Sequence, residues 1–338
     1  MQMRDDLGIT TKLENGKAYL EFALPEKVGR LLSALQIEIW EGAEGERLVF
    51  HGEYSSEEAD SMTALLLRPH LWDGVRDPYV YLVKAKGRFG AAKYGETFGV
   101  TAEEETVDAS SIDEVTEVYW RQELAIYDVR VIDKKGIFLN EKEFLPHEVV
   151  YRLPPQISDA GTRVEQVRRD LERLARMGAN VIRLEGTGTE GQDRCEVRSF
   201  YSLCRRGGFL TGDLWIRPEN LPVYRGLPGE TMTEALLAAD GRTLTERYYY
   251  YQAKWNSEPV LYPALSTLHR QENGLLSLTI YSNQKKVVLY VDGVLFLFQS
   301  AASGDPEFIF EDIPVEKLPL HLAAEAGNLS ISLTVTKL

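Results

Sequence analysis

The chain has 338 residues, of which 44% are hydrophobic and 27% charged, and its formal net charge is -14. This length predicts two or three domains of a globular protein. The negative charge disfavours nucleic acid as a partner, and no apolar run reaches the roughly 20 residues that a membrane-spanning helix needs. The polar, acidic start lacks the apolar region of a signal peptide, so we expect a cytoplasmic protein without a nucleic-acid or membrane partner.

The first predicted domain, residues 1–125, is a small antiparallel β-sandwich. Apolar and polar residues alternate with period two in the segments 17–24, 34–42, 46–54, 64–69 and 78–87. This alternation is typical of strands with one buried face, and turn residues separate the segments. Residues 101–118 are acidic and predict a loop or an exposed insert within this domain.

The second predicted domain, residues 126–255, changes period and predicts a parallel α/β unit. Residues 136–145 indicate a tight hairpin. Residues 162–177 predict a helix that Gly178 ends. Its apolar stripe consists of Val164, Val167, Leu171, Leu174 and Met177. Strand, helix, strand, helix and strand then follow, with the second helix at 194–206.

Arginine and acidic residues alternate along the first of these helices. The arginines are Arg163, Arg168, Arg169, Arg173 and Arg176, and the acids between them are Glu165, Asp170 and Glu172. Such a mixture predicts a solvated helix face with ion pairs between successive turns, rather than a nucleic-acid site.

The end of the second domain is less regular than its beginning. Residues 216–228 contain three prolines and predict a loop or linker, and a short helix is expected at about 230–238. Residues 245–255 predict a helix, although four consecutive tyrosines are poor helix formers. Strands return in the third predicted domain, residues 256–338, which is a second β-sandwich.

Cysteines, histidines and glycines give no cofactor signal. Cys195 and Cys204 are nine positions apart, about 13 Å along one helix, so both are expected to be free thiols. The five histidines are scattered without metal-ligand spacing. The glycine-rich segment 186–191 follows a strand, but the helix that would bind a dinucleotide begins too late. We therefore expect neither a metal nor another cofactor.

Several sequence stretches carry a resemblance to a known family. In chain order they are RPHLWDG with DPYVYL (68–82), KGIFLN (135–140), DLERLARMGANVIR (170–183), FYSLCRRGGF (200–209), YRGLP (224–228), RYYYYQAKW (247–255) and YSN with VLYVDG (281–293). Together, over residues 17–295, they resemble glycoside hydrolase family 2, the family of β-galactosidases, β-mannosidases and β-glucuronidases. The resemblance implies an immunoglobulin-like β-sandwich, a TIM-type α/β barrel and a second immunoglobulin-like sandwich.

The resemblance also implies a deletion in the barrel. Members of the family hold an acid/base glutamate after strand four and a nucleophilic glutamate after strand seven. Here only about 15–20 residues separate the early barrel signatures from YRGLP, whereas one βα unit takes about 30. We therefore expect a partial barrel of three or four parallel strands without either glutamate. The open edges and the apolar face of such a sheet need cover, which the acidic insert at 101–118, the segment 216–240 or a second subunit can supply. We expect a homodimer that covers the partial barrel.

Few glutamates or aspartates can replace the missing pair. Asn140-Glu141 is the only Asn-Glu pair, and it occupies a hairpin position where the family has glycine, so we interpret it as a turn. Glu185 follows a barrel strand at the end where TIM-barrel chemistry collects, and Asp213 follows the next strand. These two residues are the weak catalytic candidates.

Three further residues are candidates for substrate binding. Arg183 matches the family's active-site arginine, but it can also be a structural ion-pair partner of Glu185 or Asp213. Arg152 stands where the family has a histidine that contacts sugar. Trp255 can stack on a sugar ring, yet we prefer the interpretation that it and the preceding tyrosines seal the partial barrel against the C-terminal sandwich.

The sequence thus predicts a non-catalytic remnant of a glycosidase that binds carbohydrate or a protein partner. Two alternatives stay open. One is a residual glycosidase that hydrolyses O-glycosyl bonds with Glu185 and Asp213. The other is a structural or assembly protein without a ligand.

Overall fold

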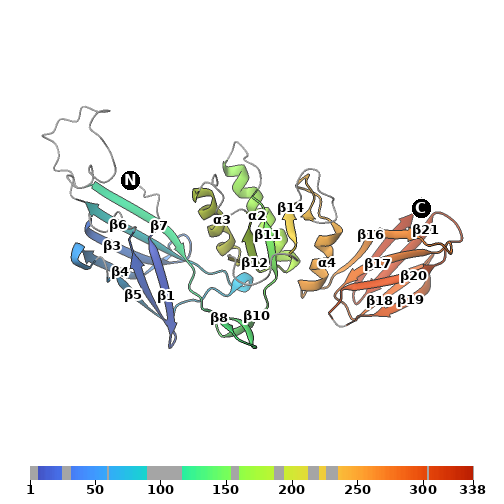
Figure 1. Ribbon diagram of the computed structural model, residues 1–338, viewed down its shortest axis with the longest axis horizontal. Coiled ribbons are helices and arrows are strands. Elements are labelled where there is room, and N and C mark those ends of the chain that lie inside the picture. The colour runs from blue at the N-terminus through green and yellow to red at the C-terminus, as the bar shows by residue number, and fades with distance from the viewer. Residues whose placement is uncertain are drawn as a thin grey trace, which may run out of the picture. The chain divides into compact units, whose positions relative to one another are not determined.

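The computed structural model describes residues 7–24, 32–58, 61–89, 116–153, 160–185, 194–211, 221–225, 235–302 and 304–337. It divides into two compact units, residues 1–145 with 191–208 and residues 146–190 with 209–338, whose elements are labelled in Figure 1. Within the described ranges, no helix is both long enough and apolar enough to cross a membrane. The glycine-rich segment, Asp213 and residues 101–115 of the predicted acidic insert lie outside these ranges, whereas residues 116–118 of that insert belong to a strand. The three-domain boundaries stay a prediction.

In its described residues, the first unit contains an antiparallel sandwich of seven strands. Its strands are β1 (Gly8–Glu14), β2 (Lys17–Ala23), β3 (Leu32–Glu41), β4 (Arg47–Ser55), β5 (Thr63–Leu67), β6 (Tyr81–Phe89) and β7 (Thr116–Leu124). One sheet has the order β1-β2-β5 and the other β4-β3-β6-β7. The predicted alternation is confirmed, because Leu20 and Phe22 of β2 point into the same core as Ile37 and Ile39 of β3.

The described part of the first unit also contains a small hairpin sheet and the α-helix α3 (Arg194–Arg206). The sheet has the order β10-β9-β8, from β8 (Val129–Ile132), β9 (Gly136–Leu139) and β10 (Lys142–Phe144). Trp72 connects both to the rest of the unit. Its indole Nε1 donates to the carbonyl of Arg205 in α3, and its own carbonyl accepts a hydrogen bond from Asn140 Nδ2. A Cβ on Gly208 would lie 2.4 Å from Val75 Cα, so only glycine fits where the helix ends.

The second unit begins with a parallel sheet of five strands in its described part. The strands are β11 (Glu148–Tyr151), β12 (Val181–Leu184), β13 (Leu210–Thr211), β14 (Val223–Arg225) and β15 (Ala235–Leu237), in the order β13-β12-β11-β14-β15. Two predictions are wrong here. β14 lies in the segment expected to be a loop, and β15 lies in the segment expected to be a helix. Three-residue strands are too short to show alternation, and the two raise the number of parallel strands above the predicted three or four.

The helix α2 (Ala160–Met177) follows β11 and precedes β12 in the chain, and its apolar stripe predicted it. Val167, Leu171, Leu174 and Met177 are all buried. Gly178 ends the helix with φ 98°, which favours glycine. A Cβ there would also lie 2.8 Å from the backbone of Trp255, so close packing requires glycine a second time.

The helix α4 (Glu246–Trp255) contacts α2 and β15 as well as β16 and β17. The strands after it are β16 (Leu261–Arg270), β17 (Leu276–Ser282), β18 (Lys286–Val291), β19 (Val294–Ser300), β20 (Glu307–Ile313), β21 (Leu320–Ala326) and β22 (Leu329–Val335). They form two antiparallel sheets, β16-β17-β20 and β19-β18-β21-β22, around one hydrophobic core. This second sandwich agrees with the predicted strands.

Candidate functional site

The strand order of the parallel sheet defines where a ligand site is expected. From β11 the chain proceeds through β12 and β13 on one side, and it then returns to β14 and β15 on the other side. In open α/β sheets, ligands bind beyond the carboxyl ends of the strands where the strand order reverses. Here that point lies between β11 and β14. Arg152 follows β11 there, and Arg225 is the last residue of β14.

Arg152 and Glu185 form an ion pair at this edge of the sheet. The guanidinium Nε donates to one carboxylate oxygen of Glu185, and Nη2 donates to the other oxygen at 3.3 Å. A further nitrogen, Nη1, donates to the carbonyl of Arg225 at 3.2 Å. Arg152 therefore binds the catalytic candidate Glu185 and links the ends of β11, β12 and β14. Both oxygens of Glu185 are occupied in a planar fork.

Arg183 has a partner other than the two acids that the sequence suggested. Its Nε donates to Glu148 Oε1 at 2.6 Å. Glu148 is only 1% exposed, so this ion pair is buried within the sheet. Arg183 is thus an ion-pair partner of Glu148, a residue that the sequence reasoning did not name. Its role in substrate binding stays a prediction.

Asp170 is the centre of a buried polar network between the helix α2 and the strands β11 and β14. Its Oδ1 accepts from Tyr224 Oη at 2.8 Å, and its Oδ2 accepts from Tyr151 Oη and from Arg225 Nη2, each at 2.9 Å. Arg173, one turn along α2, approaches Oδ1 at 3.7 Å. The expectation that Asp170 belongs to a solvated helix face is therefore wrong. It is 1% exposed, because it lies three residues after Val167 and thus on the apolar side of α2.

The network keeps its tyrosines in the neutral form. Burial raises the pKa of Tyr151, and the negative charge of Asp170 raises it further. The same two causes, in the same order, raise the pKa of Tyr224. Both phenols therefore act as hydrogen-bond donors to the carboxylate, and their rings stack with centroids 5.5 Å apart. The charge of Asp170 is balanced inside the fold and is not directed toward a ligand.

Asp240 is one more carboxylate near this edge, three residues after β15. Its Oδ1 accepts from the backbone N–H groups of Arg242 and Thr243, and its Oδ2 accepts from the Thr243 hydroxyl at 2.5 Å. These hydrogen bonds, led by the one from the Thr243 hydroxyl, lower the pKa of Asp240 to about 2. Asp240 therefore holds the turn between β15 and α4.

Trp255 contributes to the packing around α4. Its indole stacks on the imidazole of His147 with centroids 5.0 Å apart and an interplanar angle of 3°. Earlier in the helix, Tyr249 stacks on Tyr262 of β16 at 3.7 Å, while Tyr248 donates to the carbonyl of Arg173 in α2. These contacts join the parallel sheet to the C-terminal sandwich. The role of Trp255 in sugar binding stays a prediction.

The structure thus brings together Arg152 and Glu185 but does not add Arg183 or Trp255 to them. Asp213 lies outside the described residues. Sequence reasoning missed the roles of Glu148 and Asp240, and it mistook Asp170 for a surface residue. The position of Asp170 within the apolar stripe was a signal in the sequence that this residue is buried. The partners of Glu148 and Arg152 gave no such signal, because they are more than 30 positions distant in the chain.

Comparison with known proteins gives a fold but no family. No protein-family model matches the chain. No curated protein sequence matches it either. Among solved structures, it is similar to an FMN-binding β-glucuronidase from Facaelibacterium prausnitzii L2-6, with a TM-score of 0.68 and 14% identity. It is also similar to a β-glycosidase from Bacteroides vulgatus, at 0.64 and 11%, and to a β-glucuronidase from Bacteroides uniformis, at 0.59 and 14%.

Each of these alignments covers 98% of the chain, but only 73%, 64% and 60% of the three neighbours, respectively. The chain therefore spans between about three fifths and three quarters of their lengths. Identities this low establish a shared fold and nothing more. They do not transfer an activity, since one fold serves many functions.

Proposed function

We propose that this chain is a non-catalytic protein of glycoside hydrolase family 2 ancestry that binds carbohydrate without hydrolysing it. The proposal rests on one main observation: the described acids in and around the parallel sheet are engaged by other groups of the protein. The strand order and the solved structures of similar fold support the ancestry.

The strand order brings a late strand beside the first strand, while the last strand, β15, lies at the edge of the sheet. In a closed eight-stranded barrel the first and last strands are neighbours. Here β11, the first strand of the sheet, pairs with β12 on one side and with the late strand β14 on the other. Eleven residues, 212–222, separate β13 from β14. One βα unit needs about 30 residues, so the middle units of a barrel have no room.

Hydrolysis with retention or inversion requires two carboxyl groups that face the glycosidic bond. In this sheet Glu185 is held in a fork by Arg152, and Glu148 is buried against Arg183. Asp170 is enclosed by two phenols and a guanidinium, and Asp240 holds a turn. None of these four acids presents a carboxylate free of such partners to a substrate.

Carbohydrate is the ligand class that the ancestry favours. A binding protein needs hydrogen-bonding groups for sugar hydroxyls but not a nucleophile or a proton donor. Arg152 stands where the family has a histidine, and it forms an ion pair with Glu185. Both observations support the proposed loss of hydrolysis at this edge of the sheet. The predicted homodimer stays a prediction.

A hydrolysis assay tests the proposal directly. The intact chain is incubated with the 4-nitrophenyl β-glucoside, β-galactoside and β-glucuronide, and release of nitrophenol is followed over days. We expect no release above the rate without protein, both for the wild type and for Glu185→Gln. Turnover that Glu185→Gln abolishes would instead establish a residual glycosidase.

A glycan array with the same protein tests the binding half of the proposal. We expect selective retention of one group of glycans. A chain that hydrolyses nothing and retains no glycan is a structural protein, and that result contradicts the proposal.

A further inference from the structure

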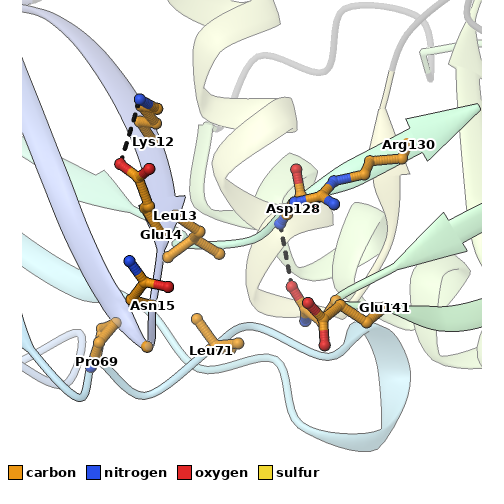
Figure 2. Close-up of a pocket in the computed structure, with 11 residues that line it drawn as sticks. Lys12, Leu13, Glu14, Asn15, Pro69, Leu71, Asp128, Arg130 and Glu141 are labelled. Carbon is orange, nitrogen blue, oxygen red and sulfur yellow. Dashed lines mark hydrogen bonds and ion pairs between the residues drawn. The ribbon is translucent and has the colours of Figure 1, made fainter.

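A cavity of about 540 Å³ lies in the first unit, between the β1–β2 hairpin and the β9–β10 turn. Its volume is within the range of ligand pockets, roughly 300–1,000 Å³. Figure 2 shows Lys12, Glu14 and Asn15 on one side, with Asp128 and Glu141 on the other. The remaining lining is partly apolar and includes Leu13, Pro69 and Leu71.

Glu141 occupies a backbone conformation that disfavours it. Asn140 and Glu141 have φ of 49° and 67°, and they form the two-residue turn between the paired Leu139 and Lys142. Such a turn has positive φ at both central residues and prefers asparagine followed by glycine. A side chain with a Cβ is strained in the second position. The glutamate is therefore held where glycine would make the fold more stable.

The turn that carries Glu141 is firmly attached to the rest of the unit. Asn140 donates through its backbone N–H to the carbonyl of Asp128 at 2.9 Å. Its side chain accepts from the N–H of Asp128 at 3.0 Å and donates to the carbonyl of Trp72 at 2.8 Å. The position of Glu141 is thus fixed by its neighbour before any ligand arrives, which lowers the entropy lost on binding.

The charges that line the cavity differ in their partners. Lys12 pairs with Glu14 at 3.3 Å, and Arg130 pairs with Asp128 at 2.5 Å. Glu141 makes no ion pair or side-chain hydrogen bond with any residue that the structure describes, and the same holds for the side-chain amide of Asn15. Glu141 and Asn15 are therefore polar residues of the cavity lining whose side chains are not engaged by another described side chain.

We propose that this cavity binds a neutral saccharide, with the carboxylate of Glu141 accepting hydrogen bonds from two adjacent sugar hydroxyls. The side-chain amide of Asn15 meets the opposite edge of the ring, and Leu13, Pro69 and Leu71 contact its C–H groups. This inference rests on the proposed function and gives it a location, since the arginines of the parallel sheet are engaged elsewhere.

The lining selects among ligand classes. Two positive and three negative side chains leave a net charge of -1, which disfavours an anionic sugar. The described residues contain no group of three or more possible metal ligands, so a metal ion has too few. An apolar ligand would bury the Glu141 carboxylate without a hydrogen-bond partner. A neutral polyhydroxyl compound satisfies the carboxylate, the amide and the apolar surface together.

The test compares two glycine substitutions in adjacent hairpin turns. Lys134, in the β8–β9 turn, also has positive φ, at 62°, but it does not line the cavity. Glu141→Gly and Lys134→Gly should therefore relieve similar strain, and each should raise the melting temperature by up to about 3 °C. Glu141→Gln keeps the side-chain length and removes only the charge.

Binding is measured by calorimetry and saturation-transfer NMR with methyl β-glucopyranoside, methyl β-galactopyranoside and methyl β-glucuronide. We expect the wild type to bind at least one neutral glycoside with a Kd on the order of 1 mM, and more tightly than the glucuronide. Glu141→Gly and Glu141→Gln should weaken that binding at least about tenfold. Lys134→Gly should leave it within about twofold of the wild type.

The possible failures are distinct. Unchanged binding in both Glu141 variants overturns this site but leaves carbohydrate binding intact. If the glucuronide binds more tightly than both neutral glycosides, the proposal that the ligand is a neutral saccharide is wrong. Wild-type protein that binds none of the three glycosides contradicts the cavity proposal, while the glycan array separately decides whether any carbohydrate is bound.

Discussion

The carboxylates of the parallel sheet and the carboxylate at the β9–β10 turn are in opposite situations. At the sheet, Asp170 and Glu148 are each 1% exposed and each meets at least one arginine. At the turn, Glu141 is exposed, meets no charged partner among the described residues and has a strained backbone. Charges of the first kind are engaged within the fold, whereas a strained charge without such a partner is the observation from which we propose a ligand site.

This contrast reverses the usual expectation for a chain with a glycosidase fold. The edge of the sheet, where catalysis is normally sought, contains acids that the protein itself neutralises. The hairpin turn, where no chemistry is expected, contains Glu141, whose carboxylate has no ion-pair partner among the described residues. A shared fold therefore does not determine which polar groups of a chain can meet a ligand.

A substitution of Asp170 should have the largest effect on stability among the tests of this contrast. Replacing Asp170 by alanine removes the shared partner of Tyr151, Tyr224 and Arg225, and leaves a buried guanidinium without its counter-charge. We expect the free energy of unfolding to fall by about 3–5 kcal/mol, measured by urea denaturation.

The matched control for Asp170 lies on the same helix. Glu165 is exposed and pairs with Arg168 at 3.2 Å. Glu165→Gln should lower the free energy of unfolding by no more than about 0.5 kcal/mol. Equal effects of the two substitutions would mean that the buried network does not support the fold.

His147 provides a smaller, pH-dependent test. Burial lowers the pKa of its imidazole, although the hydrogen bond to the Gly178 carbonyl opposes this shift. Below a pH of about 6.5, His147 is protonated in the unfolded chain but stays neutral in the folded chain. The free energy of unfolding that this residue contributes at neutral pH is therefore lost as the pH falls toward the lowered pKa.

Urea midpoints at pH 7.5 and 5.5 measure this effect. We expect the wild type to lose more stability between these values than His147→Gln does, because groups that titrate elsewhere contribute equally to both proteins. If the two proteins lose the same amount, the stacked pair of His147 and Trp255 does not exclude the charged imidazole.

Local sequence patterns predicted the long elements well. The stripe from Val167 to Met177 located α2, and Gly178 located its end, because helical period and glycine preference act within a few residues. The three-residue strands β14 and β15 escaped prediction since their pairing depends on neighbours distant in the chain.

The sites were harder to predict than the elements. Residue types alone suggested Arg152 and Glu185, yet their mutual ion pair joins positions 33 apart. The cavity combines the segments 12–16, 69–71, 128–130 and 140–141, which no spacing rule connects. One part was visible in the sequence: Glu141 stands where the resembling family has glycine. Interpreting that position as a turn was correct, but the significance of the glutamate appears only with the φ angle and the cavity.

The ion pair of Arg152 with Glu185 offers the smallest and most specific test. Glu185 has a side chain that is 47% exposed, so water screens the pair despite its fork geometry. In a double-mutant cycle with Arg152→Met and Glu185→Gln, we expect a coupling free energy of about 0.5–1 kcal/mol. Neither single variant should change saccharide binding at the cavity. A coupling free energy near zero, together with weaker saccharide binding by Arg152→Met, would show that Arg152 contacts the ligand. The sheet edge would then be a binding site, and the contrast with the cavity would be wrong.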